Sequence, residues 1–491
     1  MKCYMTFLFC LQLSMFLFVK SMNIHEMEER LKSIVFNPDA PLIGGGLAVI
    51  KDNQTLFCKS MGISRLNENG TENRTATSHT KYRTVSISKM FTAIGIWQLE
   101  EKGNLSITDE ASKYLDFNLT NPNFPDTPIT IENLLSHTSS IRELDSNYNV
   151  PYNHHISEFF DDKNSSVYYN GSYSTENEAG YFTYVNMNYC LLGTIIEVIT
   201  GERFDLYMID HVLKPLNITG SFNIYEMPEE TLDEVGTIFR KLTNGSFDIH
   251  GNWTPTKDNF THGYPKEDYS DYVIGTNGAL YGPMGSLRIS LEELTHLVYM
   301  FLNNGTYNNN TILKPETIEK MFTKVWQYDK QENNGDTEDG YDYAYSGGLS
   351  IITNVGKNRI HKTKNFNVTG HTANAYGLFG GVFVDRVKGY GIVYRGNGDS
   401  RNVETYVPDF SPYNKWAIEF IQLADDIANF DYPEINDDDQ DNQNTVVLIF
   451  IIVLVVFFIG NIACILYYRS LRNKNSDKNE QKVLLLTNQN E

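Results

Sequence analysis

The chain has 491 residues, 41% of them hydrophobic and 13% aromatic, which is the composition of a globular protein with room for one large folded unit and smaller additions. Its formal net charge of −21 at pH 7 argues against nucleic acid or anionic lipid as a partner of that folded unit. No cluster of cysteine and histidine has the spacing of metal ligands, so we expect neither a metal nor any other cofactor.

The first segment, residues 1–21, has the order of a secretory signal peptide. Lys2 gives a basic start, a mainly apolar stretch follows over residues 5–19, and the small Ser21 stands near the expected cleavage site. An uncleaved signal anchor is the alternative, because Lys20 lies at the end of the apolar stretch. We expect cleavage, since a better membrane span follows, and we assign residues 22–430 to one folded domain.

Hydrophobic periodicity and turn residues predict the first elements of this domain. In chain order we expect a helix over residues 24–35, a hairpin of strands 42–50 and 54–62 with a turn at 51–53, a polar loop over 67–80, and a helix over 86–102 that stops at Gly103.

The rest of the domain divides into a helical part and a second group of strands. Up to about residue 301 the pattern is mainly helical, with long polar loops. The later elements that we expect are strands over residues 348–352, 375–384 and 389–394 and a final helix over 414–427.

This order of elements predicts an α+β fold. The strands near the two ends of the domain would form one antiparallel sheet flanked by the terminal helices, and the middle of the chain would be inserted as an all-helical lobe. A binding cleft would then lie between the sheet and the lobe.

The end of the chain has the pattern of a membrane anchor. Residues 431–444 form an acidic linker, residues 445–468 are almost entirely apolar and long enough to span a bilayer, and residues 469–491 form a basic tail. A buried core helix is the alternative for the apolar run. With the signal peptide, we expect a single-pass type I membrane protein whose large domain is extracellular or lumenal. Residues 480–485 have acidic-dileucine spacing, which would direct the protein to endosomes or lysosomes; a chance cluster of leucines in the tail is the alternative.

The distribution of glycosylation sequons agrees with this topology. Fourteen Asn-X-Ser/Thr sequons precede the apolar run and none follows it. They begin at Asn53, Asn69, Asn73, Asn104, Asn118, Asn164, Asn170, Asn217, Asn244, Asn252, Asn259, Asn304, Asn309 and Asn367. Cys58 and Cys190 are the two cysteines between the signal and the span, and we favour two separate buried thiols over a disulfide.

A candidate nucleophile stands at the start of the long helix, in Ser86-Ile87-Ser88-Lys89. Residues i and i+3 of a helix share a face, so Lys89 would reach Ser86 Oγ and activate it, and the first backbone N–H groups would point toward a developing oxyanion. The alternative is a Ser86 that caps the helix and a Lys89 on the surface. The pattern recurs at Ser78-His79-Thr80-Lys81, in a polar loop where nothing orients the pair.

A second candidate element is Tyr184-Val185-Asn186, which directly precedes a strongly apolar helix closed by Gly201. A tyrosinate beside a cationic lysine could serve as general base, because the positive charge would lower the pKa of the phenol. The alternative is a core tyrosine followed by an asparagine that caps the helix.

In this order the residues resemble the serine β-lactamase and penicillin-binding-protein family, and within it the class C β-lactamase-related serine hydrolases, including membrane-tethered animal-type members. The resemblance covers roughly residues 43–427. It rests on the nucleophile helix, on the Tyr-x-Asn segment with its helix, and on three further stretches at residues 129–139, 282–287 and 312–317.

The resemblance implies roles for individual residues. Ser86 would be the acylated nucleophile, Lys89 its activating partner and Tyr184 the general base and leaving-group acid. Substrate binding would fall to Asn186, to His371 and Thr372 of the family's third motif, and to Asn374; the third motif here reads His371-Thr372-Ala373. His371 would hold the hydrogen-bond network of the tyrosine, or be an ordinary strand-edge histidine, and the backbone N–H of Asn374 would complete an oxyanion hole with that of Ser86.

Two positions depart from the family pattern. Ala373 and Ser140 stand where glycine is usual. A methyl group at residue 373 would narrow or reshape the substrate site.

The resemblance thus implies a serine hydrolase that acts through an acyl-enzyme on a small-molecule or peptide substrate with an ester or amide bond. The alternative is an ectodomain that kept the fold, lost turnover and acts as a binding glycoprotein. The presence of all four of Ser86, Lys89, Tyr184 and Asn186 favours the enzyme.

Overall fold

The computed structural model of the chain describes residues 23–68, 70–144, 148–260, 263–264, 267–399 and 407–429. The chain divides into two units, Met1–Phe430 and Asp431–Glu491, and all described residues belong to the first. The expected signal peptide, acidic linker, membrane span and tail lie outside these residues. Within the described ranges, none of the helices combines the length and the apolar character that crossing a membrane requires.

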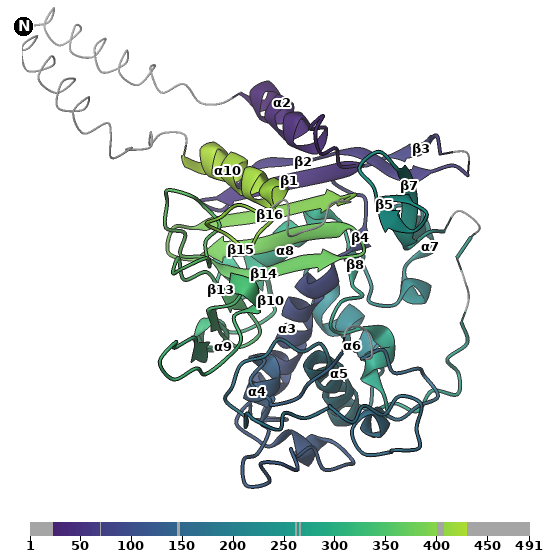
Figure 1. Ribbon diagram of the computed structural model, residues 1–491, viewed down its shortest axis with the longest axis vertical. Coiled ribbons are helices and arrows are strands. Elements are labelled where there is room, and N and C mark those ends of the chain that lie inside the picture. Colours follow the sequence, from purple (N-terminus) through teal and green to yellow (C-terminus); the bar gives the residue numbers. More distant parts are fainter. Residues whose placement is uncertain are drawn as a thin grey trace, which may run out of the picture. The chain divides into compact units, whose positions relative to one another are not determined.

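A nine-stranded antiparallel sheet forms the upper half of the domain in Figure 1. In spatial order its strands are β11 (Trp326–Gln327), β12 (Ala344–Tyr345), β13 (Ser350–Ile351), β14 (Thr369–Ala375), β15 (Leu378–Asp385), β16 (Tyr390–Asn397), β1 (Gly44–Lys51), β2 (Gln54–Leu66) and β3 (Glu72–Thr75). The N-terminal hairpin pairs with the last strand, with Gly44 opposite Asn397. The predicted α+β fold, with terminal strands in one antiparallel sheet, is confirmed.

Both faces of the sheet are covered because its central strands are apolar on both sides. In β1, Leu47 and Val49 pack into one core, while Ala48 and Ile50 pack into the other. The first core is closed by the two terminal helices, α2 (Ile24–Val35) and α10 (Lys415–Asn429), which contact each other and the sheet (Figure 1). The second core includes α8 (Leu291–Leu302) and continues into the helical lobe.

The helical lobe is built around two long helices that contact each other, α3 (Ser88–Glu101) and α5 (Met187–Thr200). The shorter helices of the domain are α4 (Ile131–Leu135), α6 (Phe204–Met208), α7 (Glu229–Leu232) and α9 (Pro315–Phe322). Gly201 ends α5 with a φ of +69°, a left-handed conformation that glycine adopts without steric cost. The predicted stop at Gly103 also has a positive φ, and helix α3 ends two residues before it.

The structure corrects several predicted elements. The expected polar loop at residues 67–80 contains β3. The segment expected to be mainly helical contains a separate three-stranded sheet of β5 (Ile238–Thr243), β6 (Ser246–Phe247) and β7 (Asn252–Lys257). Polar residues dominate these strands, so alternation is weak there, and the better signal was the Asn244-Gly245 turn, where both φ angles are positive.

The strand predicted over residues 375–384 corresponds to β15 alone. The strand before it, β14, was missed because Thr369–Ala375 is mostly polar or small. Tyr376 and Gly377 form the tight turn between the two strands, with φ values of +61° and +103°. This missed strand carries the whole of the third candidate motif.

Candidate active site

Ser86 lies in a sharp connection between strand and helix. The short strand β4 (Tyr82–Arg83) pairs with β8 (Arg288–Ile289) and leads through the 3₁₀ turn η1 (Val85–Ile87) into α3. Val85 has a φ of +49°, an unfavourable conformation for a β-branched residue. All residues from 81 to 90 are buried except Ser86, which is partly exposed. No side chain caps the start of α3, so the capping alternative for Ser86 is wrong.

Lys89 is completely buried beneath the serine, so it is not a surface charge. Its Nζ donates hydrogen bonds to Ser86 Oγ at 3.2 Å, to Asn186 Oδ1 at 2.7 Å and to the carbonyl oxygen of Met284 at 2.9 Å. Burial disfavours the charged amine and lowers the pKa of Lys89 to about 7, although Glu143 acts in the opposite direction. A large fraction of the molecules therefore carries a neutral Lys89 amine near neutral pH.

Asn186 does not cap helix α5 with its side chain. Its amide bridges two charged residues instead, because Oδ1 accepts from Lys89 while Nδ2 donates to Glu143 Oε1 at 2.7 Å. Glu143 also accepts from the backbone N–H groups of Asn186, at 2.9 Å, and Met187, at 2.8 Å, which are the first donors of the helix. Sequence reasoning missed Glu143, because 43 residues separate it from its partner.

Tyr184 packs against the same group of residues. Its ring stacks on His137 with centroids 4.3 Å apart, and Lys89 Nζ lies 5.0 Å from the ring centroid. The hydroxyl is buried and has no hydrogen-bond partner of good geometry within the described part of the chain. Burial raises the pKa of Tyr184 well above 10, and the nearby Ser86 hydroxyl offsets only part of that rise. The prediction that Lys89 lowers this pKa is wrong, because desolvation of a phenolate outweighs the attraction.

His371 lies on β14 and is 3% exposed. Its Nδ1 is 2.8 Å from the carbonyl oxygen of Thr372, so Nδ1 carries the proton and donates it. Burial and the neighbouring Lys89 lower the pKa of His371 to about 3, so the ring is neutral at pH 7. Neither its Nε2 nor the Tyr184 hydroxyl has a hydrogen-bond partner among the described residues, so the role predicted for His371 in the hydrogen-bond network of the tyrosine is not seen here.

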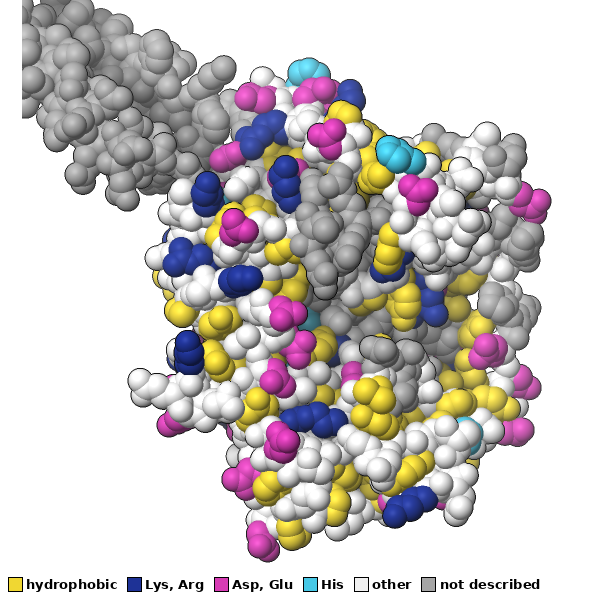
Figure 2. Space-filling view, viewed as in Figure 1, with side chains coloured by type: hydrophobic (Ala, Val, Ile, Leu, Met, Phe, Trp, Pro, Cys, Tyr) yellow, Lys and Arg dark blue, Asp and Glu magenta, His cyan; other side chains and the backbone are white. Residues whose placement is uncertain are grey.

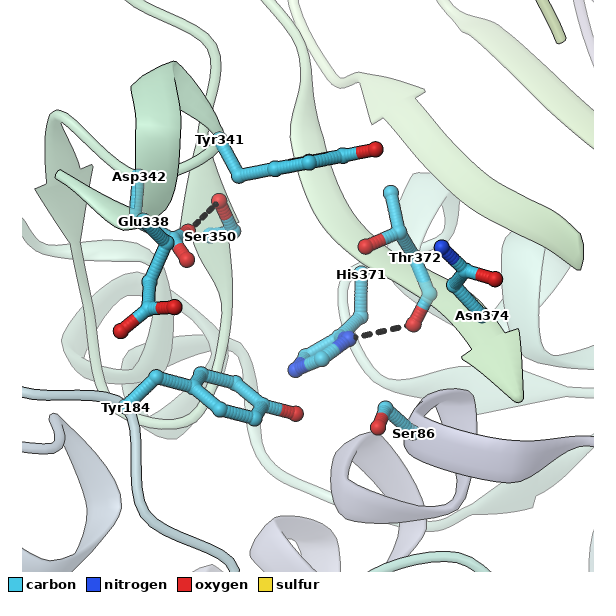
Figure 3. A pocket seen from close by; sticks show the side chains of 9 residues that line it. All are labelled: Ser86, Tyr184, Glu338, Tyr341, Asp342, Ser350, His371, Thr372 and Asn374. Carbon is cyan, nitrogen blue, oxygen red and sulfur yellow. Dashed lines mark hydrogen bonds between the residues drawn. The ribbon is translucent and has the colours of Figure 1, made fainter. Parts of the chain in front are cut away.

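Two pockets meet at the serine. The first has a volume of about 220 Å³, and Figure 3 shows its lining side chains pointing into a common space. It is lined by Ser86, Tyr184, Glu338, Tyr341, Asp342, Ser350, His371, Thr372 and Asn374. The second, of about 450 Å³, is lined by Arg83, Val85, Ser86, Tyr148, Asn149, Tyr184, Asn186, Lys257, Met284, Gly285, Ser286, Asn374, Ala375 and Tyr376. Ser86, Tyr184 and Asn374 line both.

The structure therefore brings all seven predicted site residues together. Six of them line one or both pockets, and Lys89 lies behind Ser86. Sequence reasoning missed the acidic side chains of the smaller pocket, Glu338 and Asp342. They lie in a polar segment without hydrophobic periodicity, which gave no signal of its own.

The two departures from the family pattern have different consequences. Ala373 is 3% exposed, belongs to the hydrophobic core and lines neither pocket, so its methyl group does not narrow the site as we expected. Ser140 has a φ of +63°, which explains why glycine suits this position. The serine is buried there, and its Oγ accepts a hydrogen bond from Asn121 at 3.2 Å.

The second Ser-x-x-Lys sequence has a structural role. Lys81 is buried, and its Nζ forms an ion pair with Glu293 at 2.7 Å. The two cysteines of the domain are separate thiols, as predicted, but only Cys190 is buried and Cys58 is half-buried.

Comparisons with known proteins agree on one family. The sequence model of the beta-lactamase family matches residues 31–410, which is most of the chain. The protein flp of Staphylococcus aureus (strain MW2) is 29% identical over 175 residues, or 36% of this chain and 34% of that protein. The chain thus matches about a third of the length of this curated relative.

Solved structures share the fold at lower identity. The octameric penicillin-binding protein homologue from Pyrococcus abyssi has a TM-score of 0.57 and 21% identity, over 82% of this chain and 77% of that chain. The D-amino acid amidase from Ochrobactrum anthropi, solved with L-phenylalanine amide, has a TM-score of 0.56 and 14% identity, over 81% of this chain and 98% of that chain.

Proposed function

Because the chain belongs to the beta-lactamase family, we propose that it is a serine hydrolase that transfers an acyl group from an ester, amide or peptide to water through an acyl-Ser86 intermediate. The observation that carries this proposal is the pair of Ser86 Oγ and Lys89 Nζ, 3.2 Å apart, with the lysine completely buried. A buried amine without a carboxylate in direct contact costs stability, and such a group beside a hydroxyl in a cleft is typical of a catalytic base.

In the first step, Lys89 acts as the base. Its pKa of about 7 leaves a neutral amine that takes the proton of Ser86 Oγ as the oxygen attacks the carbonyl carbon. The amide oxygen of Asn186 and the carbonyl oxygen of Met284 then stabilise the ammonium ion that forms. The backbone N–H groups of Ser86 and Asn374 remain our candidates for the oxyanion hole.

Tyr184 completes the proton transfer in this scheme. Since its pKa is raised, the phenol is neutral and donates a proton to the leaving group. The ammonium ion of Lys89 then gives its extra proton to the phenolate of Tyr184. In the second step, water attacks the acyl carbon and loses a proton to Lys89, and Lys89 gives that proton to Ser86 Oγ as the bond between the acyl carbon and Oγ breaks. The base role that we first gave to Tyr184 thus passes to Lys89.

The proposal is tested by measuring hydrolysis with the full-length chain. A phenyl ester, an amino-acid 4-nitroanilide and a chromogenic β-lactam cover the three bond types. We expect turnover of at least one, and loss of that turnover in Ser86→Ala by a factor of 10³ or more. Ser78→Ala is the matched control, because it alters the serine of the other Ser-x-x-Lys sequence. Equal activity of wild type and Ser86→Ala would overturn the proposal, as would the absence of any hydrolysis.

We also propose that the domain works outside the cytosol, anchored by residues 445–468. All thirteen sequon asparagines within the described residues are exposed, which supports a glycosylated domain. Protease protection of the tail in intact cells, together with a mass shift of the domain after enzymatic removal of N-glycans, would be the expected result. A domain protected with the tail and unchanged in mass would contradict this topology.

A further inference from the structure

The smaller pocket beside Ser86 has a wall built of acceptor groups. Glu338 lies within a tight turn, in which Glu338 and Asp339 have φ values of +44° and +56°, and it is exposed at the rim of the pocket. Asp342 is 8% exposed and accepts one hydrogen bond, from Ser350 Oγ at 2.7 Å. Neither Glu338 nor Asp342 forms an ion pair with any described residue. A buried carboxylate without a cation is costly, so this wall lacks a positive partner.

A second kind of acceptor, the imidazole of His371, points into the same pocket from strand β14. His371 Nδ1 donates its proton to the backbone, so Nε2 of the neutral ring carries a lone pair. In Figure 3 this nitrogen faces the side of the pocket where Glu338 lies. It is buried and has no partner among the described residues. Two carboxylates and an imidazole lone pair thus line one cavity, and no Lys or Arg stands among its described lining residues.

The charges around the serine are arranged asymmetrically. Among the described residues, none that lines the smaller pocket is Lys or Arg, whereas Arg83 and Lys257 line the larger one. The surface seen in Figure 2 is hollowed near its middle, with acidic side chains along one side of the hollow. A substrate that crosses Ser86 therefore meets carboxylates without a cationic partner among the described residues on one side. On the other side it meets Lys257 and Arg83, of which Arg83 is paired with Asp258.

We propose that the smaller pocket is a subsite for a positively charged N–H donor group, an ammonium or guanidinium, on the substrate of the hydrolase. Such a group carries several donors and one charge, which matches the acceptors of Glu338, Asp342 and His371. The inference rests on the proposed function and names the substrate class of that site: amines and peptides with a cationic group next to the bond that is broken.

A metal ion fits this wall less well than an organic cation does. Within the described part of the chain, no three side chains of His, Cys, Asp or Glu are arranged to hold a metal ion. An alkylammonium or guanidinium group is larger, and it can bond to acceptors that lie on different walls of the cavity.

The subsite is tested with matched substrates of the full-length chain at pH 8. In one pair, 4-(aminomethyl)phenyl butanoate and 4-ethylphenyl butanoate, the ammonium lies in the leaving group. In the other, alanine 4-nitroanilide and propanoyl 4-nitroanilide, it lies in the acyl group. We expect kcat/KM to favour the charged member of at least one pair by a factor of 10 or more. The double variant Glu338→Gln/Asp342→Asn should reduce that ratio to below 2.

The control variant is Glu332→Gln, which removes an exposed carboxylate from the same segment and should keep the wild-type ratio. A ratio near 1 in the wild type, or an unchanged ratio in the double variant, would overturn the subsite while leaving the hydrolase proposal intact.

Binding to the Ser86→Ala chain separates the two proposals, because it needs no turnover. By titration calorimetry, butylammonium should bind at least tenfold more tightly than 1-butanol. Adding Glu338→Gln and Asp342→Asn to the Ser86→Ala chain should abolish this difference in affinity. Selective binding by a chain whose wild type hydrolyses nothing would sustain the subsite and refute the proposed function. Equal binding of the two probes would refute the subsite.

Discussion

Replacing Glu143 with glutamine should shift the pH dependence of the enzyme toward acid. Glu143 and Lys89 are connected through the amide of Asn186, with hydrogen bonds of 2.7 Å on each side. The carboxylate stabilises the protonated lysine and so raises its pKa. At a separation of roughly 6 Å and an effective dielectric constant of about 20, Coulomb's law gives about 3 kcal/mol, or roughly 2 pKa units.

The direction of the shift in the pH profile depends on which protonation form of Lys89 is active. If the neutral amine is the base, activity rises with pH through the pKa of Lys89, which is about 7 in the wild type. Without the negative charge, the lysine loses its proton at lower pH. We therefore expect the acid limb of kcat/KM for Glu143→Gln to have its midpoint at a pH of roughly 5.

The assay is hydrolysis of the neutral ester 4-ethylphenyl butanoate between pH 4.5 and 9.5. A neutral ester is needed because Glu338 and Asp342, with pKa values of about 7 and 6, titrate in the same range and would affect a charged substrate. Glu143→Asp keeps the charge and should keep the midpoint near 7. Glu176→Gln removes an exposed carboxylate and should also leave it unchanged.

The change also has a structural cost. Glu143 accepts three hydrogen bonds, and a glutamine has only one acceptor oxygen, so we expect a loss of about 1–3 kcal/mol in the free energy of unfolding. The measurements are therefore made well below the unfolding temperature. An acid limb that stays near pH 7 or moves to higher pH would refute the assignment of Lys89 as the base and of Glu143 as the residue that tunes it.

Two further predictions concern stability. Burial raises the pKa of Asp342 from 3.8 to about 6, so the native state binds more protons than the unfolded state between these values and stability falls as pH rises through them. Asp342→Asn should remove that decline and raise the free energy of unfolding at pH 7.5 by up to about 3 kcal/mol, whereas equal or lower stability would contradict the reasoning. Asp258 is buried between Arg83 and Arg288, at 2.9 and 2.8 Å. Asp258→Asn should cost roughly 3–5 kcal/mol in urea unfolding, because it leaves two buried guanidinium groups without their carboxylate, and a loss below about 1 kcal/mol would be evidence against this.

Much of the fold could be predicted from the sequence because its core elements follow simple periodic patterns. Helix α2 was predicted with its observed bounds, and the first hairpin follows from an apolar run that ends at the turn residues Asp52 and Asn53, both of which adopt positive φ. The missed strands β3 and β14 are polar and lack an alternation of apolar residues, and pairing with neighbouring strands holds them in place. Patterns within one segment do not reveal such pairings.

The candidate site was predictable only as far as its residues follow local motifs. Ser86 and Lys89 share one turn of a helix, so their contact follows from spacing alone. Glu143 could not be found in this way, because its contact with Asn186 depends on how a loop folds over the start of α5. The pKa of Tyr184 was predicted in the wrong direction for a related reason, since burial, the dominant cause, is a property of the assembled fold.

The most direct test of the account is the position of a covalent adduct. The full-length chain is treated with a fluorophosphonate at pH 8, digested, and analysed by mass spectrometry. The account predicts a single modified residue, Ser86, with labelling retained in Ser78→Ala and absent from Ser86→Ala. An adduct at another residue, or labelling that persists in Ser86→Ala, would contradict the claim that Ser86 is the nucleophile.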